Sequence, residues 1–502
     1  MHFLTSSLLL FLFFLSLQAQ SADVKEWTFL VFMNADNDLY YSGLNDLAEM
    51  EKVGSSKDVN VVVQLDPNTA GESTHRYYVR RNSNPVPGKT TAQVLQDLPE
   101  TDMGSAQTLS EFLKWGTTNF PAKKYALIIW NHGTGWQGVS YDNNPNNHLT
   151  LPELRRGLEG FQAYPNSNRT APKIDLLSFD ACLMSSLEVA FELKDSVGIM
   201  VGSQFLVPRS GSDYSGILQN LIEKPGRTAV ELAKDIVYRY ALGYPDQKYI
   251  QYIALDLSKI AKFTSVFNAA AKEMVASLPL LRAQISNTLV NPSYGGFDLD
   301  ISLKNALEIA PADGRLGSSI KNVLNLYGYP RDEIQAGPSE GQRMVKVRRH
   351  YPGSLYLSDL RIPNSIRILP LIKTGRREYS ASFSYQMPMQ FWVVAIGAEQ
   401  AHHEARTVIL RSRFSDGGFS RNSNGDSVEV IYHDNFPAGS PVIANAMNLQ
   451  STGSHGLTLF SLMGAQERAI GHFPAGIEMI QSYLQLRFAQ TGAPAWTQFF
   501  MR

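Results

Sequence analysis

A run of apolar residues ends at the single cysteine of the chain in Lys173-Ile-Asp-Leu-Leu-Ser-Phe-Asp-Ala-Cys-Leu-Met184. A second apolar run ends at Trp130-Asn-His-Gly133. Each run is typical of a buried parallel strand, and each is followed by a reactive residue type where the strand would leave the sheet. Open α/β sheets bind ligands at this carboxyl edge. The two runs therefore predict a site at which Cys182 and His132 meet.

The predicted chemistry is acyl transfer by a thiol. Sulfur attacks as the thiolate, and a nearby imidazole can deprotonate it or stabilise it as an ion pair. His132 precedes Cys182 by fifty residues, which is the order and rough spacing found in caspases. Gly133 lets the backbone approach a substrate closely, so its N–H and that of Cys182 are the candidate oxyanion donors.

Strands and helices alternate over the first half of the chain, which predicts a three-layer α/β fold with a mostly parallel sheet. The predicted strands are Trp27 to Met33, Val59 to Asp66, Ala126 to Trp130, Ile174 to Phe179, Gly198 to Ser203 and Tyr249 to Leu255. The predicted helices are Leu39 to Val53, Ala106 to Thr118, Leu151 to Phe161, Leu183 to Leu193, Thr228 to Leu242 and Ala261 to Asn287. Ser105 and Thr150 are predicted helix caps.

The pattern changes after about Gln342, where short strand-like runs alternate with turns rich in Pro, Gly, Asn and Ser. Glu378 to Tyr385 and Phe391 to Ile396 are two such runs. This pattern is typical of a β-rich region. We therefore expect a catalytic α/β domain over residues 22–340 and a β-rich accessory region, with C-terminal closing segments, over residues 341–502.

Three segments carry a resemblance to a known family. Asn131-His-Gly-Thr-Gly-Trp136 and Asp180-Ala-Cys-Leu-Met184 resemble the two catalytic motifs of the clostripain family of cysteine peptidases. Trp27-Thr-Phe-Leu-Val-Phe-Met-Asn-Ala-Asp-Asn-Asp-Leu39 is similar to the first strand and acidic turn of that family. Gly456 to Phe460 and Trp496 to Phe500 loosely resemble its closing segments. The resemblance implies the caspase-like fold that the family shares with gingipains and legumains.

The resemblance also implies roles for individual residues. His132 would be the general base and Cys182 the nucleophile of a dyad, and Asp180 would lie at the floor of the S1 pocket and select Arg or Lys at P1. A carboxylate there would pair with a guanidinium or ammonium group. Asp180 has an alternative role as the cap of a helix that begins near Met184.

The segment Ser203-Gln-Phe-Leu-Val-Pro-Arg-Ser-Gly-Ser-Asp-Tyr214 follows a predicted strand and is the candidate wall of the S1 pocket. Ser203 and Gln204 begin it, and both are expected to take part in substrate binding. Asp213 is an alternative acidic determinant of specificity. Aspartate in a loop is also a common turn former.

The first residues predict export. Leu4 to Leu17 is almost wholly apolar, and small and polar residues follow it. The apolar run is too short for a comfortable membrane span and is typical of a signal peptide over residues 1–21, with an uncleaved anchor as the alternative. We therefore expect a secreted or periplasmic bacterial protein without stable membrane insertion.

The composition restricts the partners. The formal net charge is −1 and there is no sustained basic run, so we expect no nucleic-acid partner. Proteins or peptides with Arg or Lys at P1 are the expected substrates. The alternative is a catalytically latent binding module that recognises a surface protein or glycan. A third hypothesis is an acyltransferase or transpeptidase, in which an amine replaces water in the reaction with the thioester.

No cofactor or metal is expected to be required, although relatives can depend on calcium, so calcium binding stays open. Asp36 and Asp38 form an acidic turn that offers oxygen ligands, but both are also typical caps of the following helix. The turn-rich segment Asp142 to His148 is predicted to be exposed and mobile. It contains no Lys or Arg, so self-processing by a basic-specific enzyme would occur elsewhere, for example at Arg169.

Overall fold

The structure is a computed structural model of the 502-residue chain. It describes residues 24–68, 73–161, 173–244 and 251–277 continuously. Beyond residue 277 it describes 314–327, 439–448 and 475–501, together with separate strands and single residues. The predicted signal peptide, residues 1–21, and the predicted processing residue Arg169 lie outside the described residues.

Five parallel strands form the centre of a large sheet, in the order β2-β1-β5-β8-β9. They are β1 (Lys25–Ala35), β2 (Val59–Pro67), β5 (Ala122–Trp130), β8 (Ile174–Asp180) and β9 (Val197–Gly202). All are buried almost throughout, because helices cover both faces of the sheet. The predicted parallel α/β sheet is confirmed.

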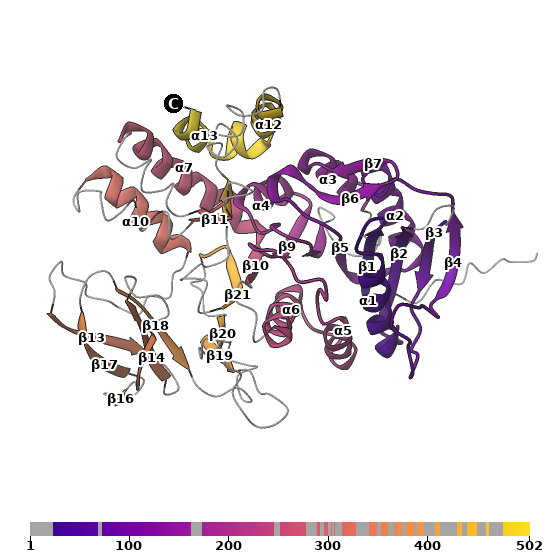
Figure 1. Ribbon diagram of the computed structural model, residues 1–502, viewed down its shortest axis with the longest axis horizontal. Helices are drawn as coiled ribbons and strands as arrows, with labels where there is room; N and C mark the ends of the chain where they lie inside the picture. The colour runs from indigo at the N-terminus through magenta and orange to yellow at the C-terminus, as the bar shows by residue number, and fades with distance from the viewer. Residues whose placement is uncertain are drawn as a thin grey trace, which may run out of the picture.

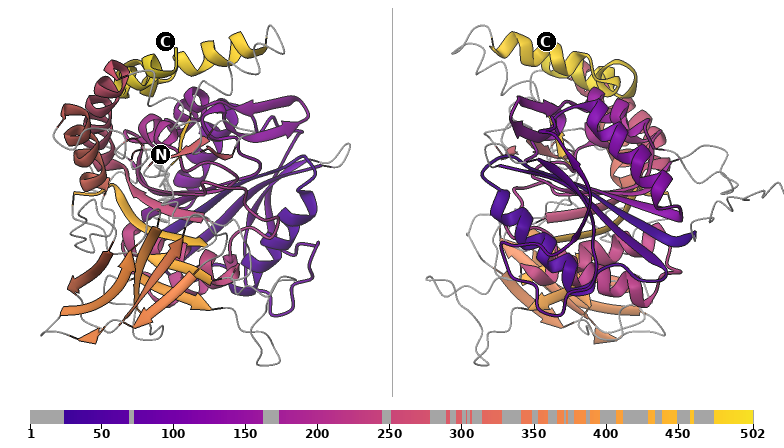
Figure 2. Two further views of the ribbon diagram at one scale, coloured as in Figure 1. Left: turned by 60° about the vertical axis from the view of Figure 1, so that its left-hand side comes forward. Right: turned by 90° about the vertical axis from the view of Figure 1, so that its right-hand side faces the viewer.

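Helices cover the two faces of the sheet separately, as Figures 1 and 2 show. One face packs against α1 (Tyr40–Val53), α5 (Tyr214–Glu223) and α6 (Ala229–Gly243). The apolar core on the other face includes α2 (Ala106–Asn119), α3 (Leu151–Leu158), α4 (Leu187–Leu193) and α7 (Ile260–Ala276). In the same core, α10 (Arg315–Tyr327) and α13 (Pro494–Met501) pack against α7. Each face has its own apolar core, so the predicted three-layer architecture is confirmed.

Strands that pair mostly antiparallel extend the sheet at both edges. On one side β3 (Thr74–Tyr78) and β4 (Gln93–Leu98) follow β2. On the other side β10 (Gln251–Asp256) pairs with β9, and β21 (Val442–Asn448), which comes much later in the chain, pairs with β10. The order then continues through β20 (Glu429–His433), β19 (Thr407–Arg411), β18 (Met389–Ala395), β14 (Gly353–Asp359) and β15 (Ile366–Pro370).

The second half of the chain contains the expected short strands. The strand predicted over Glu378 to Tyr385 is β17 (Glu378–Tyr385), and the run beginning at Phe391 lies in β18. The remaining elements are β6 (Val139–Asn143), β7 (Asn146–Leu149), β11 (Leu289–Asn291), β12 (Gly296–Asp298), β13 (Gly341–Arg348), β16 (Ile372–Lys373), β22 (Thr458–Phe460) and α12 (Ala475–Leu484). The division of the chain at residue 341 stays a prediction.

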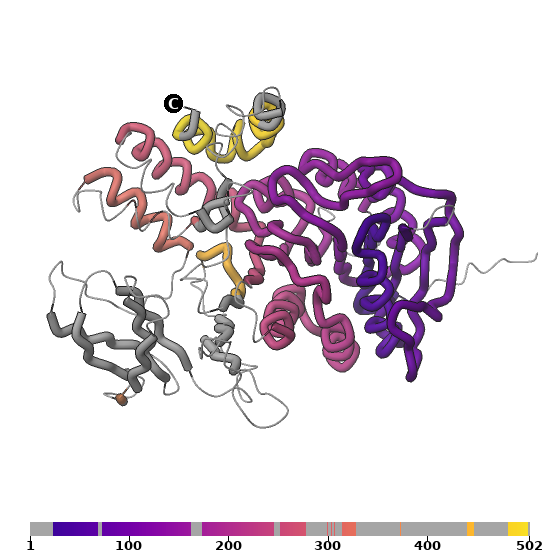
Figure 3. The backbone as a smooth tube through the Cα atoms, viewed as in Figure 1, coloured from indigo at the N-terminus to yellow at the C-terminus, as the bar shows by residue number. Residues whose placement is uncertain are grey.

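The C-terminal closing segments lie against the α/β core. Trp496 of α13 is buried, with its ring centroid 5.4 Å from that of Phe267 on α7. Figure 3 shows the yellow C-terminal helix beside α7. β22 pairs with β12 in a small separate sheet. No helix in the described part of the chain is long and apolar enough to cross a membrane.

One local prediction was wrong, and another was incomplete. The helix expected from Leu183 begins at Leu187, because Leu183 has a φ of 66° and the side chain of Ser186 caps the helix by accepting from the N–H of Val189. The segment Asp142 to His148 is exposed from Asn143 to Asn147, as expected, but it forms the tip of the β6–β7 hairpin, and Asp142 at its start is only 2% exposed.

The two predicted helix caps are where we expected them. The side chain of Ser105 accepts from the N–H of Gln107, and Thr150 donates from its N–H and hydroxyl to Glu153. In both helices a side-chain oxygen accepts from a backbone N–H at the N-terminus that has no partner within the helix.

Candidate active site

A pocket opens where β5 and β8 end. Trp130 and Asp180 are register partners at the last position of these adjacent parallel strands, so the residues that follow them lie side by side. His132 and Cys182 both line the pocket. The other lining residues are Leu39, Trp130, Asn131, Asp180, Ala181, Leu206, Val207, Pro208, Arg209 and Gly211.

Gly133 is the point at which the histidine loop meets the cysteine loop. A Cβ at this position would lie 2.4 Å from the carbonyl oxygen of Cys182 and 3.0 Å from Sδ of Met184. Only glycine allows this approach of one backbone to the other. From the sequence we expected Gly133 to let the backbone approach a substrate. In the structure the backbone that Gly133 approaches is that of Cys182.

Cys182 lies in a turn between β8 and α4 that the neighbouring loop holds in place. Leu183 has a left-handed backbone, and its N–H donates to the carbonyl of Phe205 at 3.1 Å. The N–H of Val207 donates to Sγ of Cys182 at 3.2 Å. Burial raises the pKa of the Cys182 thiol, and the hydrogen bond from Val207 opposes this only in part. The thiol is therefore neutral in this state.

His132 is bound to an acid rather than to the thiol. Its Nε2 lies 2.7 Å from Oδ1 of Asp38, and the guanidinium of Arg209 binds both the carboxylate and the backbone carbonyl of Asp38. The hydrogen bonds with His132 and Arg209 hold the pKa of Asp38 below its usual range. Within the described residues no hydrogen bond joins the imidazole to Sγ of Cys182. The side chains of His132, Asp38 and Arg209 are all substantially exposed.

Asp180 is one of two buried carboxylates beside the pocket. It accepts from the N–H of Ser212 at 3.0 Å and from the hydroxyl of Tyr214 at 2.8 Å, both neutral donors. Asp46 of α1 accepts from Nε1 of Trp130 at 2.7 Å. Both acids border Gly211, where a Cβ would lie 2.8 Å from Asp180 and 3.2 Å from Asp46.

Burial raises the pKa of both acids. The pKa of Asp46 is raised further by the neighbouring charge of Asp180, whereas the hydrogen bonds from Tyr214 and Ser212 oppose the rise at Asp180. Asp180 is not a helix cap, because Ser186 fills that position for α4. Sequence reasoning missed Asp46, which is far from Asp180 in the chain and approaches it only through the packing of α1.

The loop after β9 contributes a wall of the pocket, but through later residues than the sequence suggested. Leu206, Val207, Pro208 and Arg209 line the pocket. Ser203 is buried and donates to the carbonyls of Phe205 and Gln251, so it shapes the loop from within.

Gln204 and Asp213 are likewise outside the pocket lining. Gln204 is 1% exposed. Asp213 caps α5 by accepting from the N–H of Gly216 and forms an ion pair with Arg239 at 2.9 Å, which makes it a turn former rather than a pocket acid.

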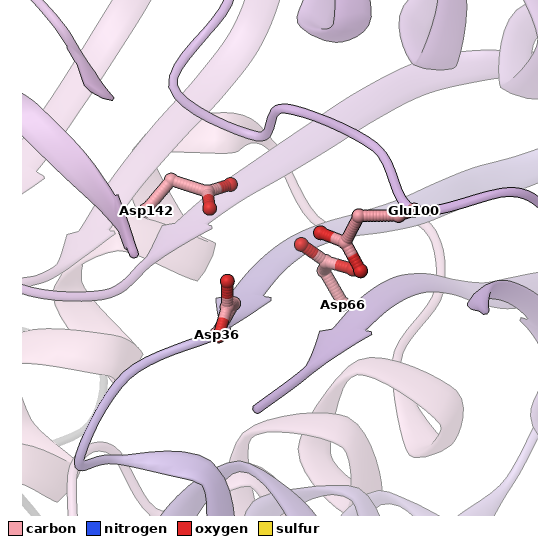
Figure 4. A group of neighbouring side chains, drawn as sticks. All are labelled: Asp36, Asp66, Glu100 and Asp142. Carbon is pink, nitrogen blue, oxygen red and sulfur yellow. The ribbon is translucent and has the colours of Figure 1, made fainter. Parts of the chain in front are cut away.

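The acidic turn after β1 also differs from expectation. Neither Asp36 nor Asp38 caps α1; the N–H of Leu39 instead donates to Oδ1 of Asn37. Asp38 contacts His132, while Asp36 joins a second group of acids with Asp66, Glu100 and Asp142 (Figure 4). The sequence analysis missed that group, which is the candidate metal site of the described residues.

Comparison with known proteins identifies relatives of the chain. The sequence profile of the Clostripain family matches residues 31–305, more than half of the chain. Clostripain of Hathewaya histolytica is 28% identical over 230 residues, which cover 39% of this chain and 42% of that protein. The matched region therefore spans less than half of the length of that relative.

Solved structures of similar proteins include two C11 proteases, each with a TM-score of 0.47. One is a secreted C11 cysteine protease from Bacteroides thetaiotaomicron in complex with an irreversible peptide inhibitor; it is 19% identical, and the match covers 60% of this chain and 82% of that one. The other is an inactive zymogen C11 protease from Parabacteroides distasonis; it is 17% identical, with coverage of 71% and 92%.

Proposed function

The chain belongs to the clostripain family, and from this premise we propose that it is an exported cysteine endopeptidase that hydrolyses peptide bonds after Arg or Lys. The family match covers the strands that carry His132 and Cys182. The observation that supports the proposal most is that both residues line one pocket together with Asp180.

The proposed reaction uses His132 as the base and Cys182 as the nucleophile. The imidazole takes the thiol proton, the thiolate attacks the scissile carbonyl carbon, and the oxyanion accepts hydrogen bonds from the N–H groups of Gly133 and Cys182. The imidazolium then protonates the leaving amine, and a thioester remains. Water, deprotonated by His132, hydrolyses the thioester and restores the thiol.

The ground state described above has to change before this reaction begins. His132 is hydrogen-bonded to Asp38, and Cys182 is protonated and accepts from Val207. The exposed contacts of Asp38 with His132 and Arg209 are weak, on the order of 1 kcal/mol or less each, because water screens them. Substrate binding therefore needs little free energy to bring the imidazole to the sulfur.

The two buried acids support a basic P1 residue. Asp180 receives hydrogen bonds from neutral groups, and Asp46 receives one from an indole. Arg209, the basic residue in the pocket lining, is bound to Asp38 instead. A guanidinium or ammonium group entering the pocket would compensate the buried negative charge, whereas an apolar side chain would leave it without a counter-charge.

A matched set of peptides tests this proposal. The peptides carry Arg, Lys, citrulline or Leu at P1, and citrulline matches the shape of Arg without its charge. We expect cleavage after Arg and Lys and at least about 30-fold lower kcat/KM for citrulline and Leu, since losing one partner of a buried charge pair costs about 2–5 kcal/mol. Equal cleavage after citrulline would contradict a charge-selective pocket.

Variants of the chain separate the dyad from the specificity acid. Cys182→Ala and His132→Ala are expected to abolish cleavage of every peptide. Asp180→Asn keeps an oxygen that can accept from Tyr214 and is expected to reduce the preference for Arg over citrulline. Asp213→Asn, which alters the cap of α5 outside the pocket, is the matched control and is expected to keep that preference.

Export rests on the sequence of residues 1–21. Expression in a bacterial host with an export pathway, followed by mass measurement of the protein recovered outside the cytoplasm, tests it. A mature chain that begins close to residue 22 supports the proposal, and a full-length chain retained in the cytoplasm contradicts it.

A further inference from the structure

One tyrosine near the C-terminus touches both halves of the active-site edge. Tyr483 lies near the end of α12 and is 1% exposed. Its ring meets the indole of Trp136 edge to face, with the ring centroids 5.1 Å apart. Its hydroxyl donates to Oε1 of Glu188 at 3.0 Å. Trp136 follows the catalytic histidine in the chain and Glu188 follows the catalytic cysteine, so Tyr483 connects the two segments.

Trp136 is joined closely to the histidine loop. It lies in a short 3₁₀ turn, η1 (Gly135–Gln137), that begins three residues after His132. The N–H of Thr134 donates to the carbonyl of Gly138 at 3.0 Å, which closes the loop around η1. A displacement of the indole therefore moves the backbone that carries His132.

Glu188 is joined just as closely to the cysteine loop. It lies in the first turn of α4, which the side chain of Ser186 caps. Leu183 to Ser186 connect Cys182 to this helix, so a shift of its first turn reaches the nucleophile. Glu188 is 0% exposed, and a buried carboxylate oxygen that loses a donor cannot replace it with water. The hydroxyl of Tyr483 therefore restrains the position of this turn.

Further contacts hold the C-terminal segment against α4. The N–H of Phe488, which begins the π-helical turn η5 (Phe488–Gly492), donates to Oε1 of Glu192 at 3.2 Å. The ring centroids of Phe488 and Phe191 are 6.1 Å apart. A Cβ at Gly492 would lie 3.0 Å from the ring of Phe191. Tyr483 thus belongs to a continuous packed contact with α4, and its position is well defined.

We propose that Tyr483 is a positioning residue of the peptidase, which fixes the backbone of His132 relative to that of Cys182. This inference rests on the proposed function. Tyr483 is not part of the pocket lining, so it acts through Trp136 and Glu188. The contact at Gly133 joins the two loops at one point, and one point of contact leaves them free to rotate against each other. The second connection through Tyr483 removes that freedom.

The ground state makes this restraint necessary for the reaction. The imidazole of His132 has to turn from Asp38 to the sulfur of Cys182. A side chain can change its partner without loss of precision only if the backbone behind it stays in place. The C-terminal segment is then a working part of the catalytic site, although Tyr483 lies 295 residues after Glu188 in the chain.

Two substitutions of Tyr483 test the proposal by steady-state cleavage of an Arg peptide. Tyr483→Phe keeps the ring against Trp136 and loses the bond to Glu188, whereas Tyr483→Leu loses both contacts. We expect kcat to fall about 3- to 10-fold for Tyr483→Phe and about 10- to 100-fold for Tyr483→Leu, since a misplacement of about 1 Å can cost on the order of 100-fold. KM should stay within about twofold of the parental value, because the substrate pocket is unchanged. A kcat within about twofold of the parent in Tyr483→Phe and in folded Tyr483→Leu overturns the proposal.

Substitutions of Glu188 test whether the hydrogen bond carries the effect. Glu188→Gln keeps an oxygen that can accept from the Tyr483 hydroxyl and is expected to keep kcat within about twofold of the parent. Glu188→Ala removes the acceptor and is expected to lower kcat as Tyr483→Phe does. The double variant should lose little more than either single variant, because both remove the same bond. Losses that multiply in the double variant overturn the proposal.

Trp496→Phe is the control for a general loss of stability. Trp496 is also a buried aromatic residue near the C-terminus, but its ring packs against Phe267 of α7, away from both active-site loops. We expect this variant to lower the thermal midpoint at least as much as Tyr483→Phe and to keep kcat within about twofold of the parent. A fall in kcat equal to that of Tyr483→Phe would show that kcat reports stability alone and would overturn the proposal.

Hydrogen exchange measures the restraint without relying on cleavage. The measurement uses the full chain with Cys182→Ala, which prevents self-digestion. We expect the amides of residues 131–139 and 181–190 to exchange at least about threefold faster in Tyr483→Phe and at the parental rate in Trp496→Phe. Parental exchange in both segments of Tyr483→Phe and of folded Tyr483→Leu overturns the proposal. If the chain with Cys182 cleaves no peptide, the proposed function fails, while hydrogen exchange still decides whether Tyr483 holds the two loops.

Discussion

Replacing Gly133 by alanine tests whether contact between the histidine and cysteine loops sets the geometry of the dyad. The new Cβ would lie 2.4 Å from the carbonyl oxygen of Cys182 and close to Met184 and Ala181. Real Cβ atoms stay at least 3.0 Å from such neighbours, so the two loops must move apart by about 0.6 Å or more. The moving atoms belong to the backbone of the nucleophile itself.

The expected loss follows from this displacement. A misplacement of about 1 Å can cost on the order of 100-fold in rate, so Gly133→Ala is expected to lower kcat/KM for an Arg peptide by about 10- to 100-fold. The added methyl group in a packed contact should also lower the free energy of unfolding by about 1–3 kcal/mol. Steady-state cleavage and urea unfolding of the same preparation measure the two effects.

Gly226→Ala is the matched control, because a Cβ at that position has no atom within 4 Å. It is expected to leave both quantities unchanged. The reasoning is refuted if Gly133→Ala keeps at least half of the parental kcat/KM. It is equally refuted if stability falls while kcat/KM is unchanged, since the contact would then support the fold without positioning the dyad.

Glu51→Ala is expected to lower the free energy of unfolding in urea by about 2–5 kcal/mol, because the carboxylate of Glu51 is 1% exposed and accepts from the buried N–H of Ala92 and the partly buried N–H of Thr91. Glu51→Gln, which keeps one oxygen, should cost about half as much, and an alanine variant within about 0.5 kcal/mol of the parent would contradict this. Burial raises the pKa of the Cys182 thiol, so at a given pH a smaller fraction of it is thiolate than in free cysteine. The rate at which iodoacetamide alkylates the substrate-free protein should therefore rise with pH and reach half its maximum above about pH 8.5, the pKa of free cysteine. A half-maximum below pH 7 would mean that His132 already forms an ion pair with the thiol.

The sheet was predictable because its central strands are buried on both faces. A continuous apolar run such as Phe29 to Met33 has few alternatives to a central parallel strand, and the strand ends were predicted to within a few residues. The pairing of β5 with β8 then brings His132 close to Cys182, which the order of the two runs already indicated.

The start of α4 was not predictable from apolar spacing. Leu183, Met184 and Leu187 match a helical face, but the first two belong to the turn that carries Cys182. The hydrogen bond from Leu183 to Phe205 fixes that turn, and its partner comes from a loop more than twenty residues away. A serine three residues before Val189 was the only local signal for the true cap.

Two groups of acids depend on contacts between distant segments: the Asp46–Asp180 pair and the cluster of Asp36, Asp66, Glu100 and Asp142. A partial signal existed for the cluster, since β1 and β2 are neighbours and Asp66 is the register partner of Asn34, two residues before Asp36. Glu100 and Asp142 carried no such signal. Asp46 resembles any polar residue of an amphipathic helix until α1 is packed against the sheet.

The pairing of β10 with β21 affects how the chain can fold during synthesis. These strands are neighbours in the sheet, yet Asp256 and Val442 are separated by 185 intervening residues. At about 5–20 residues per second, β10 leaves the ribosome roughly 10–40 s before its partner. During that interval β10 has an open edge that can pair with another nascent chain. A chain that stops before residue 442 would keep this edge permanently, so premature termination would produce an aggregation-prone fragment rather than a smaller enzyme.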